Sequence, residues 1–240
     1  RRAVILGDPK QLRHITHITK QVDQQLLSEH EVLEWAPRWS YRANSLYDLA
    51  AAFTRSVTLR DHFRSDAEII AFSNEYFYKG EELRVATPYD RLRRPQPPAP
   101  VVRWIHITGR VVRPPQGGAV NDAEAKAVVA ELHRLLVDQR YDGTIGVVSP
   151  FRAQANRIRD LVHQNDSILR SLGQSDLLID TVYKFQGDER DVIIFSPVVS
   201  TDTPRTATGF LSGNPNTFNV AIERAFSSSV TNMNTDPNVN

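Results

Sequence analysis

The chain has 240 residues, of which 40% are hydrophobic and 24% charged, a composition typical of one large globular domain or one domain with an appendage. No apolar run approaches the roughly 20 residues that a membrane-spanning helix needs. The sequence contains no cysteine, which excludes disulfides and thiolate metal sites and suits the reducing cytosol, or the nucleus in a eukaryote. The net charge of +1 argues neither for nor against nucleic-acid binding, because a groove that follows a phosphate backbone needs only local basic residues.

The N-terminal segment begins with the apolar run Ala3 to Leu6, which predicts a buried strand, and the turn Gly7-Asp8-Pro9 follows at once. Because a buried strand is an unusual natural start, we expect the chain to be part of a longer protein. The next roughly 30 residues show no clean period and predict one short helix and a loop. Ser45 to Phe53 predicts a helix, with apolar residues at helical spacing behind a capping serine.

The central part of the chain predicts short elements among many helix-breaking residues. Val57 to Leu59 predicts a strand, and Asp66 to Tyr78 predicts an amphipathic helix that ends before Gly80. Residues 84–118 are rich in proline and glycine and predict a surface excursion, within which Val101 to Ile107 has the pattern of a strand.

The second half of the chain predicts an α/β fold. Asn121 to Val137 predicts a strong helix, in which Asn121 and Glu124 can form a capping box. Strands and helices then alternate, which favours a mainly parallel sheet with helices on both faces, a three-layer α/β/α arrangement. Residues 227–240 are polar and predict a loose tail. The expected strands are 144–148, 177–182 and 191–195, and the expected helices are 152–163 and 217–225.

The segment Thr181 to Phe195 carries the most informative pattern. It predicts a strand end, a tight turn at Gln186-Gly187, an acidic residue at Glu189 and then a buried central strand. A backbone N–H freed by glycine and a carboxylate two residues later can hold a phosphate and a ribose hydroxyl side by side. The alternative is a turn with a surface carboxylate.

Two earlier segments also carry groups that suit a nucleotide. In Gly7 to Leu12, Gln11 can donate to a phosphate oxygen and accept from water, but taken alone the segment favours the simpler interpretation, an Asp-Pro turn that closes a strand. At a strand-to-helix junction, Phe63 can stack on a base, and the guanidinium of Arg64 matches phosphate oxygens. The alternative for Arg64 is an ion pair with a neighbouring aspartate.

Two later segments add groups for a nucleic-acid strand and for a phosphate. In Gly146 to Gln154, the hydroxyl of Ser149 and the first N–H groups of a basic helix form an anion site, beside the possible stacking face of Phe151. A proline at the first helical turn with an exposed basic face is the simpler alternative. In Phe218 to Phe226, an apolar helical face ends in Arg224, which can also be a solvated residue.

Five segments occur in the order GDPKQL, HFRS, SPFRAQ, TVYKFQGDE and NVAIERA. In this order they resemble the C-terminal motor half of superfamily 1 nucleic-acid helicases, in the subgroup that moves 5′→3′, from Gly7 to about Ala225. The resemblance implies a RecA-like motor lobe over residues 56–226. It also implies that residues 1–55 are the end of the first motor lobe and a connection, with residues 227–240 as the tail.

The resemblance implies catalytic roles for three residues. Gln11 would sense the γ-phosphate of ATP, Arg64 would act as an arginine finger, and Arg224 would complete the clamp on the γ-phosphate. The last of these motifs departs from the family pattern, because Glu223 replaces a threonine and Phe226 replaces a second arginine. A carboxylate beside Arg224 could weaken the field of that arginine.

The resemblance also implies binding residues. Phe63 would stack on the adenine, while Gly187 and Glu189 would contact the nucleotide. The sugar-phosphate backbone of single-stranded DNA or RNA would lie along the segment SPFRAQ and the strand end that follows it. The residues expected to touch this strand are Ser149, Pro150, Phe151 and Thr181.

The P-loop motif GxxxxGK[ST] does not occur in the chain, nor does the acidic pair that holds Mg²⁺ in helicases. We therefore expect ATP and Mg²⁺ to be bound mainly by a first motor lobe of the same parent chain, and this lobe alone to be inactive. A different class of function is a non-catalytic module that binds nucleic acid or protein on a helicase scaffold. An unrelated nucleotide-binding domain is a weaker alternative, because it predicts a glycine-rich phosphate loop after a strand and the sequence shows none.

Overall fold

The computed structural model describes residues 3–14, 16–96, 100–200, 202–203 and 205–233. The chain divides into two compact units, Arg1–Leu59 and Arg60–Asn240. The sequence placed the border between residues 55 and 56. In the described part of the chain, no helix is long and apolar enough to cross a membrane.

The first unit consists of short helices. Thr19 caps helix α1 (Lys20–Glu29), and Ser45 caps helix α3 (Leu46–Ala51), as predicted. Ser45 also forms a reciprocal capping box with Asp48. Buried Asp23 accepts hydrogen bonds from the Ser40 hydroxyl at 2.5 Å and the Tyr41 N–H at 3.2 Å, which ties α1 to the loop after α2. The remaining elements of the unit are η1 (Leu33–Trp35) and α2 (Ala36–Trp39).

The expected strand Ala3 to Leu6 is absent from the described part of the first unit. Val4 and Leu6 are 87% and 83% exposed, and the segment pairs with no described strand. An apolar run becomes a strand only when neighbouring strands satisfy its backbone groups, and the described residues of this unit form none.

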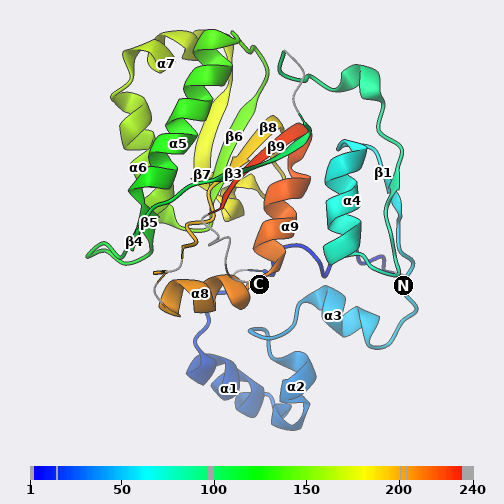
Figure 1. The fold of residues 1–240 in the computed structure, drawn as a ribbon. Helices are drawn as coiled ribbons and strands as arrows, with labels where there is room; N and C mark the ends of the chain where they lie inside the picture. Colours follow the sequence, from blue (N-terminus) through cyan, green and yellow to red (C-terminus); the bar gives the residue numbers. More distant parts are fainter. Residues whose placement is uncertain (1–2, 15, 97–99, 201, 204, 234–240) are drawn as a thin grey trace. The chain divides into compact units, whose positions relative to one another are not determined.

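The second unit is built around a five-stranded sheet in the order β3-β9-β8-β6-β7, in which every neighbouring pair is parallel (Figure 1). All six residues of β8 are buried, so the prediction of a central strand after Glu189 is confirmed. The predicted α/β class with a mainly parallel sheet is confirmed as well. The strands are β3 (Val102–His106), β6 (Ile145–Ser149), β7 (Leu177–Thr181), β8 (Arg190–Phe195) and β9 (Ala225–Met233).

Helices cover both faces of this sheet. Alternate residues of β8 point to opposite faces. Val192 and Ile194 join the core beneath α5 and α6. The ring of Phe195 instead packs edge-on against the ring of Phe218 of α9, with their centroids 4.8 Å apart. Figure 1 shows α5, α6 and α7 on one side of the sheet and α4 with α9 on the other. The helices are α4 (Ala67–Tyr76), α5 (Asp122–His133), α6 (Arg152–His163), α7 (Asp166–Ser171), α8 (Arg205–Ser212) and α9 (Asn216–Glu223).

Residues 225–233 contradict the prediction of a loose tail. They form β9, which lies between β3 and β8 and pairs with both in parallel. Main-chain hydrogen bonds to two neighbouring strands stabilise this segment although its composition is polar, and composition alone does not report such pairing. The rest of the predicted tail, residues 234–240, lies outside the described residues.

The predicted strand Val57 to Leu59 is also wrong. Val57 and Leu59 are more than 80% exposed, and pairing begins further along the chain, where β1 (Asp61–His62) joins β2 (Arg84–Val85) in parallel. The other predicted elements form within a few residues of their expected bounds. Smaller elements are η2 (Tyr89–Arg91), the antiparallel pair β4 (Val111–Val112) and β5 (Val120–Asn121), the π-helical turn η3 (Arg134–Asp138), η4 (Leu172–Gln174) and η5 (Val182–Phe185).

Half of the predicted capping box at α5 forms. The side chain of Asn121 accepts from the N–H of Glu124 at 3.2 Å, but the Glu124 carboxyl turns into the core instead of returning to Asn121. It accepts from the Ser196 hydroxyl at 2.6 Å and the Val198 N–H at 3.1 Å. Burial raises the pKa of Glu124 to about 7, and these two hydrogen bonds oppose the shift.

Replacing Glu124 with glutamine is expected to change how stability depends on pH. The unfolded carboxyl has a pKa of about 4.5, so the stabilising neutral form is lost as pH rises through about 7. This group should therefore lower the free energy of unfolding by about 2 kcal/mol between pH 5 and pH 7.5. Urea denaturation at both pH values should show that the decrease disappears in Glu124→Gln, which keeps the acceptor oxygen.

His62 changes the pH dependence of stability in the opposite direction to Glu124. Burial, aided by the charge of Arg64, lowers its pKa to about 4, so its contribution is lost as pH falls from 6.5 towards 4. Because the wild type and Glu124→Gln both contain His62, the contribution of His62 cancels when the free energies of unfolding of the two proteins are subtracted. An unchanged slope in the variant would mean that Glu124 is ionised in the fold near neutral pH.

Candidate functional site

Three side chains that are distant in sequence meet at one place in the second unit. Arg64 comes from the loop between β1 and α4, Glu189 from the residue before β8, and Arg224 from the C-cap of α9. Arg64 Nε lies 2.5 Å from Glu189 Oε1, and Arg64 and Glu189 both act on the charge of Arg224. We call these three residues the arginine rim. Arg64 and Arg224, which the resemblance assigned to the same γ-phosphate, therefore lie near each other.

Hydrogen bonds between main chain and side chain hold the arginine rim together. The hydroxyl of Ser65 donates to the carbonyl of Glu223 at 3.4 Å, which links the Arg64 loop to the end of α9. Thr87 donates to the carbonyl of Ser65 at 2.7 Å and fixes this loop from the other side. The N–H of Arg190 donates to the carbonyl of Arg224 at 3.1 Å, so the strand after Glu189 is joined directly to Arg224.

The arginine rim concentrates positive charge in a partly dry environment. Arg224 is only 6% exposed. Burial is the main cause that lowers its pKa, and the charge of Arg64 lowers the pKa further. The carboxylates of Glu223, Glu189 and Asp188 act in the opposite direction. Glu223 therefore favours the charged form of Arg224, and an anion bound between the two guanidinium groups would do the same.

The other predicted nucleotide residues border the arginine rim. Phe63, adjacent to Arg64, is 67% exposed, so its ring is accessible for stacking. Gly187 has a φ of +89°, a left-handed conformation that glycine adopts readily, and the turn places Glu189 before β8. The Arg64–Glu189 pair is partly exposed, with side-chain exposures of 31% and 36%. Such pairs contribute only about 0–1 kcal/mol, so a ligand can displace Glu189 from Arg64.

Gln11 lies in the first unit, in a turn of the kind that its simpler interpretation predicted. The side chain of Asp8 accepts from the Lys10 N–H at 2.8 Å, and its carbonyl accepts from the Gln11 N–H at 3.2 Å. The role of Gln11 at a γ-phosphate stays a prediction.

The residues expected at a nucleic-acid strand gather at the carboxyl ends of β6 and β7. Ser149 and Thr181 are partners in the parallel register, so the two strand ends lie side by side. Both side chains are buried, and the Ser149 hydroxyl accepts from the N–H of Phe151 at 3.3 Å across Pro150. This hydrogen bond shapes the turn into α6. We call Ser149, Pro150 and Thr181 the strand-end cluster.

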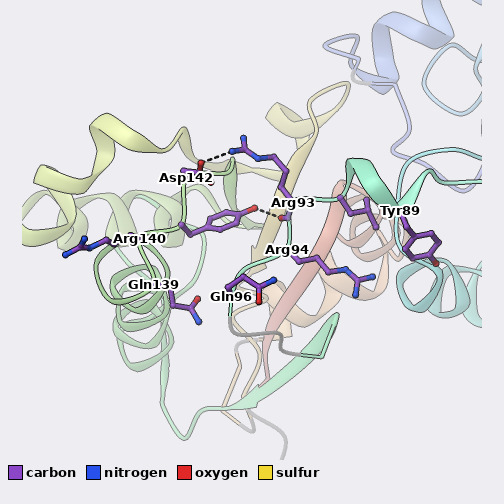
Figure 2. A pocket seen from close by; sticks show the side chains of 9 residues that line it. Tyr89, Arg93, Arg94, Gln96, Gln139, Arg140 and Asp142 are labelled. Atoms are coloured by element: carbon purple, nitrogen blue, oxygen red, sulfur yellow. Dashed lines mark hydrogen bonds and ion pairs between the residues drawn. The ribbon is translucent and has the colours of Figure 1, made fainter.

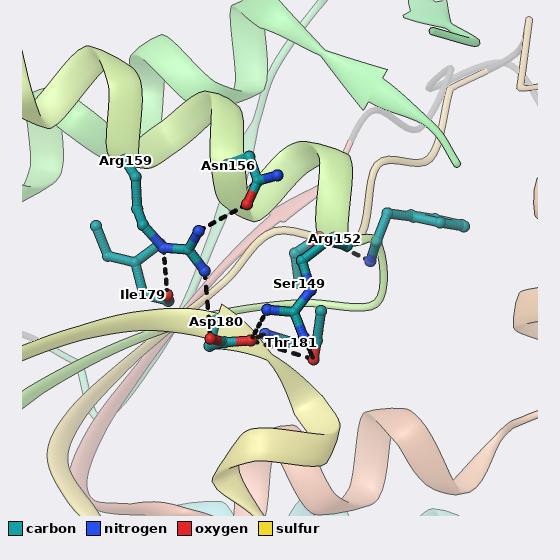
Figure 3. Close-up of polar contacts among 8 residues, drawn as sticks. Ser149, Arg152, Asn156, Arg159, Ile179, Asp180 and Thr181 are labelled. Atoms are coloured by element: carbon teal, nitrogen blue, oxygen red, sulfur yellow. Dashed lines mark hydrogen bonds and ion pairs between the residues drawn. The ribbon is translucent and has the colours of Figure 1, made fainter. Parts of the chain in front are cut away.

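Two arginines of α6, Arg152 and Arg159, bind the aspartate that precedes Thr181 of the strand-end cluster (Figure 3). Arg152 donates to Asp180 Oδ1 at 2.7 Å and reaches Thr181 Oγ1 at 3.5 Å. Arg159 donates to Asp180 Oδ2 at 3.2 Å and to the carbonyl of Ile179 at 2.9 Å. The side chain of Arg152 remains 56% exposed, so it is the member of this group most accessible to a phosphate.

The expected stacking face of Phe151 is not exposed. The side chain is 8% exposed, and its ring packs against Phe210 with centroids 5.6 Å apart, in a small core with Val198 and Ala207. The turn at Pro150 directs the ring inward, where burial of apolar area stabilises the start of α6. An aromatic residue between polar ones predicted exposure here, and that prediction is wrong.

Sequence reasoning did not assign a role to Gln154 of the segment SPFRAQ. Its amide is fully buried; it accepts from the Asn121 N–H at 2.9 Å and donates to the Asn121 carbonyl at 3.1 Å and to the Ser196 hydroxyl at 3.0 Å. Gln154 therefore joins α6 to α5 and to the end of β8. The signal in the sequence was its place on the apolar face of α6, three residues after Phe151 and four before Ile158.

The arginine rim lies at the amino ends of the strands, and the strand-end cluster lies at their carboxyl ends. Glu189 and Arg224 precede β8 and β9, whereas Ser149 and Thr181 end β6 and β7. The connection 182–189 runs from the carboxyl end of β7 to the amino end of β8. Its Phe185 is fully buried against Gly146, where a Cβ would come within 2.6 Å of the phenyl ring, so the connection packs directly on β6.

Among the residues that the structure describes, no group of three His, Asp or Glu side chains could hold a metal ion. The arginine rim and its neighbour Phe63 offer guanidinium cations, a carboxylate and an exposed aromatic ring. This set suits a phosphate-bearing molecule.

Comparison with known proteins gives the family. The family model described as "AAA domain" matches residues 42–232, and the chain belongs to this family. It is 32% identical over 186 residues to the putative helicase MOV-10 of Gallus gallus, a match that covers 68% of this chain and 19% of that protein. It is 28% identical over 235 residues to the uncharacterized ATP-dependent helicase MG140 of Mycoplasma genitalium, covering 92% of this chain and 20% of that protein.

The chain thus spans about a fifth of the length of these relatives. Among solved structures, the C-terminal domain of a possible DNA helicase from a Lactobacillus strain matches with a TM-score of 0.41 at 11% identity, over 73% of this chain and 90% of that one. That likeness is too low to carry an argument. The family and the helicase relatives confirm the resemblance to helicases that the motifs indicated.

Proposed function

We propose that this chain is the C-terminal motor lobe of an ATP-dependent nucleic-acid helicase. The observation that carries the proposal is the meeting of Arg64 and Arg224 beside Glu189, at one edge of a parallel sheet. Burial and the charge of Arg64 lower the pKa of Arg224, so a multiply charged anion such as a γ-phosphate would stabilise the charged form of Arg224. The name of one relative, an ATP-dependent helicase, supports the same nucleotide.

ATP would lie between this lobe and a first lobe that carries the P-loop and the Mg²⁺ ligands. The charge that develops on the γ-phosphate oxygens in the transition state would be stabilised by Arg64 and Arg224. Glu189, released from Arg64, would accept a hydrogen bond from the ribose, and the turn at Gly187 would bring the backbone close to the nucleotide. Gln11 would contact the γ-phosphate or its attacking water.

The strand-end cluster would hold single-stranded DNA or RNA through its sugar-phosphate backbone. Arg152, with a half-exposed side chain, would contribute a phosphate contact next to Ser149 and Thr181. Because the connection 182–189 packs across the sheet between this cluster and the arginine rim, a change at Glu189 on hydrolysis would be transmitted to Thr181. Closing and opening of the two lobes would then tighten and loosen the grip on the strand.

Replacing Phe63 with alanine is expected to raise KM for ATP about 10-fold with little change in kcat. An exposed ring that stacks on a base contributes about 1–3 kcal/mol to binding, equally before and in the transition state. Steady-state ATP hydrolysis by the intact helicase would measure both constants. Tyr76→Ala is the matched control, because Tyr76 is a similarly exposed aromatic residue on α4, and it should leave KM unchanged.

The proposal is tested by comparing the isolated chain with the intact protein that contains it. The isolated chain should bind single strands more weakly as salt concentration rises, because binding releases counterions. It should not hydrolyse ATP, since it lacks a P-loop. The intact protein should hydrolyse ATP faster when single strands are present. ATP turnover by the isolated chain that depends on Arg64 would contradict the proposal.

A further inference from the structure

Arg190, the first residue of β8, carries a guanidinium to which the motifs give no role. Its side chain is only 11% exposed and binds two carboxylates. Arg190 Nη1 lies 2.5 Å from Asp176 Oδ2, and Nη2 lies 2.9 Å from Asp188 Oδ2. The stem of the side chain is closely packed as well, because a Cβ at Gly146 of β6 would lie 3.0 Å from Arg190 Cγ. The guanidinium is therefore fixed near the amino ends of the strands.

The two carboxylates that this guanidinium binds lie in different surroundings. Asp176 precedes β7 and is mostly exposed. Asp188 lies in the turn between Gly187 and Glu189, and its Oδ1 accepts from the Glu189 N–H at 2.9 Å. The negative charge of Asp188 also acts on Arg224. Asp188 is thus the carboxylate that borders the arginine rim.

A carboxylate in this position opposes the binding of an anion. Its charge repels a phosphate, and an unpaired Asp188 would also compete with that phosphate for the guanidinium of Arg224. In the structure, however, Asp188 is bound to an arginine outside the rim. This pair occupies neither Arg64 nor Arg224, so it can persist when a phosphate binds.

We propose that Arg190 is a positioning residue for the nucleotide, an inference that rests on the proposed function. It binds the carboxylate of Asp188 and neutralises its charge, which leaves the two guanidinium groups of the arginine rim available to phosphate oxygens. Both oxygens of Asp188 then have partners, Arg190 and the Glu189 N–H, so the turn after Gly187 is fixed too. Arginine suits this role because its planar fork reaches two carboxylates through different nitrogens.

The test is steady-state ATP hydrolysis by the intact helicase. Arg190→Gln should raise KM for ATP about 5-fold with a smaller change in kcat, because the unpaired carboxylate repels the phosphates both before and in the transition state. Adding Asp188→Asn should return KM to within about twofold of the wild type, since asparagine lacks the charge but keeps the oxygen that accepts from the Glu189 N–H. Adding Asp176→Asn instead should not restore KM, because Asp176 is mostly exposed and precedes a different strand.

Further variants separate charge from folding. Arg190→Met removes the charge but keeps an apolar stem, so it should show the same rise and the same reversal, and it decides the question if Arg190→Gln does not fold. Arg190→Lys keeps the charge and should stay closer to the wild type. Arg93→Gln is the matched control. Arg93 binds one carboxylate, Asp142, at 3.0 Å beside a pocket outside the arginine rim (Figure 2), and its loss should leave KM unchanged.

Reversal of the raised KM by Asp188→Asn, but not by Asp176→Asn, supports the role of Arg190. An unchanged KM in Arg190→Gln would overturn it. So would a raised KM that Asp188→Asn does not reverse or that Asp176→Asn reverses equally. The Arg64→Ala variant distinguishes this failure from a failure of the proposed function. A lowered kcat in that variant, with no reversal by Asp188→Asn, would remove only the role of Arg190, whereas an unchanged kcat would remove both.

Discussion

Replacing Arg64 with alanine is expected to lower kcat for ATP hydrolysis by the intact helicase on the order of 10³-fold, with little change in KM. Arg64 lies beside Arg224 and forms a partly exposed ion pair with Glu189, which contributes little to the stability of the fold. Its interaction with the γ-phosphate would therefore be made chiefly in the transition state. The same weak pair predicts that the variant folds normally. Steady-state ATP hydrolysis and thermal denaturation measure the two effects.

Arg60→Ala is the matched control for this prediction. Arg60 is four residues earlier in the same unit and pairs with Glu82 at 3.4 Å on an exposed surface. Its loss should leave kcat unchanged. An Arg64→Ala enzyme that retained kcat within about fivefold of the wild type would remove the arginine finger from the account.

Replacing Arg224 with alanine is expected to lower kcat by a similar factor. Arg224 is 6% exposed, so its charge acts in a partly dry environment where electrostatic stabilisation is stronger than in water. The double variant should lose little more than the worse single variant, because residues that act on the same oxygens are strongly non-additive. The kcat values of the wild type, both single variants and the double variant complete this cycle.

Arg224→Lys separates charge from geometry. Lysine keeps the positive charge beside Glu223 and Glu189 but lacks the planar fork. It should retain the folded stability of the wild type and lose most of the activity. Losses in the double variant that equal the product of the single losses would show that the two arginines act at separate places.

The sequence predicted those parts of the fold that local patterns specify. Helix α6 forms with the predicted bounds because an amphipathic period, a proline before its first turn and a histidine near its end all agree. Strand β8 was predicted from a buried apolar run entered through a glycine turn. The convergence of Arg64, Glu189 and Arg224 followed from the order of motifs and not from any local pattern, since 158 residues separate Ser65 from the Glu223 carbonyl it binds.

The errors arose where a partner distant in sequence decides the outcome. Strand β9 is polar, and its pairing with β3 and β8 cannot be seen in its own residues. Ala3 to Leu6 is apolar but has no described strand beside it. Phe151 was expected to be exposed, whereas Phe210, 59 residues later in the chain, covers its ring. In each case local composition predicted the opposite of what the tertiary neighbours impose.

The most direct measurement is a crystal structure of the intact helicase bound to ADP, aluminium fluoride and a single strand. The guanidinium groups of Arg64 and Arg224 should both lie within hydrogen-bonding distance of the fluoride ligands, about 2.7–3.2 Å. The carboxylate of Glu189 should no longer be bound to Arg64. A complex in which either arginine side chain points away from the trapped transition-state mimic would contradict the account.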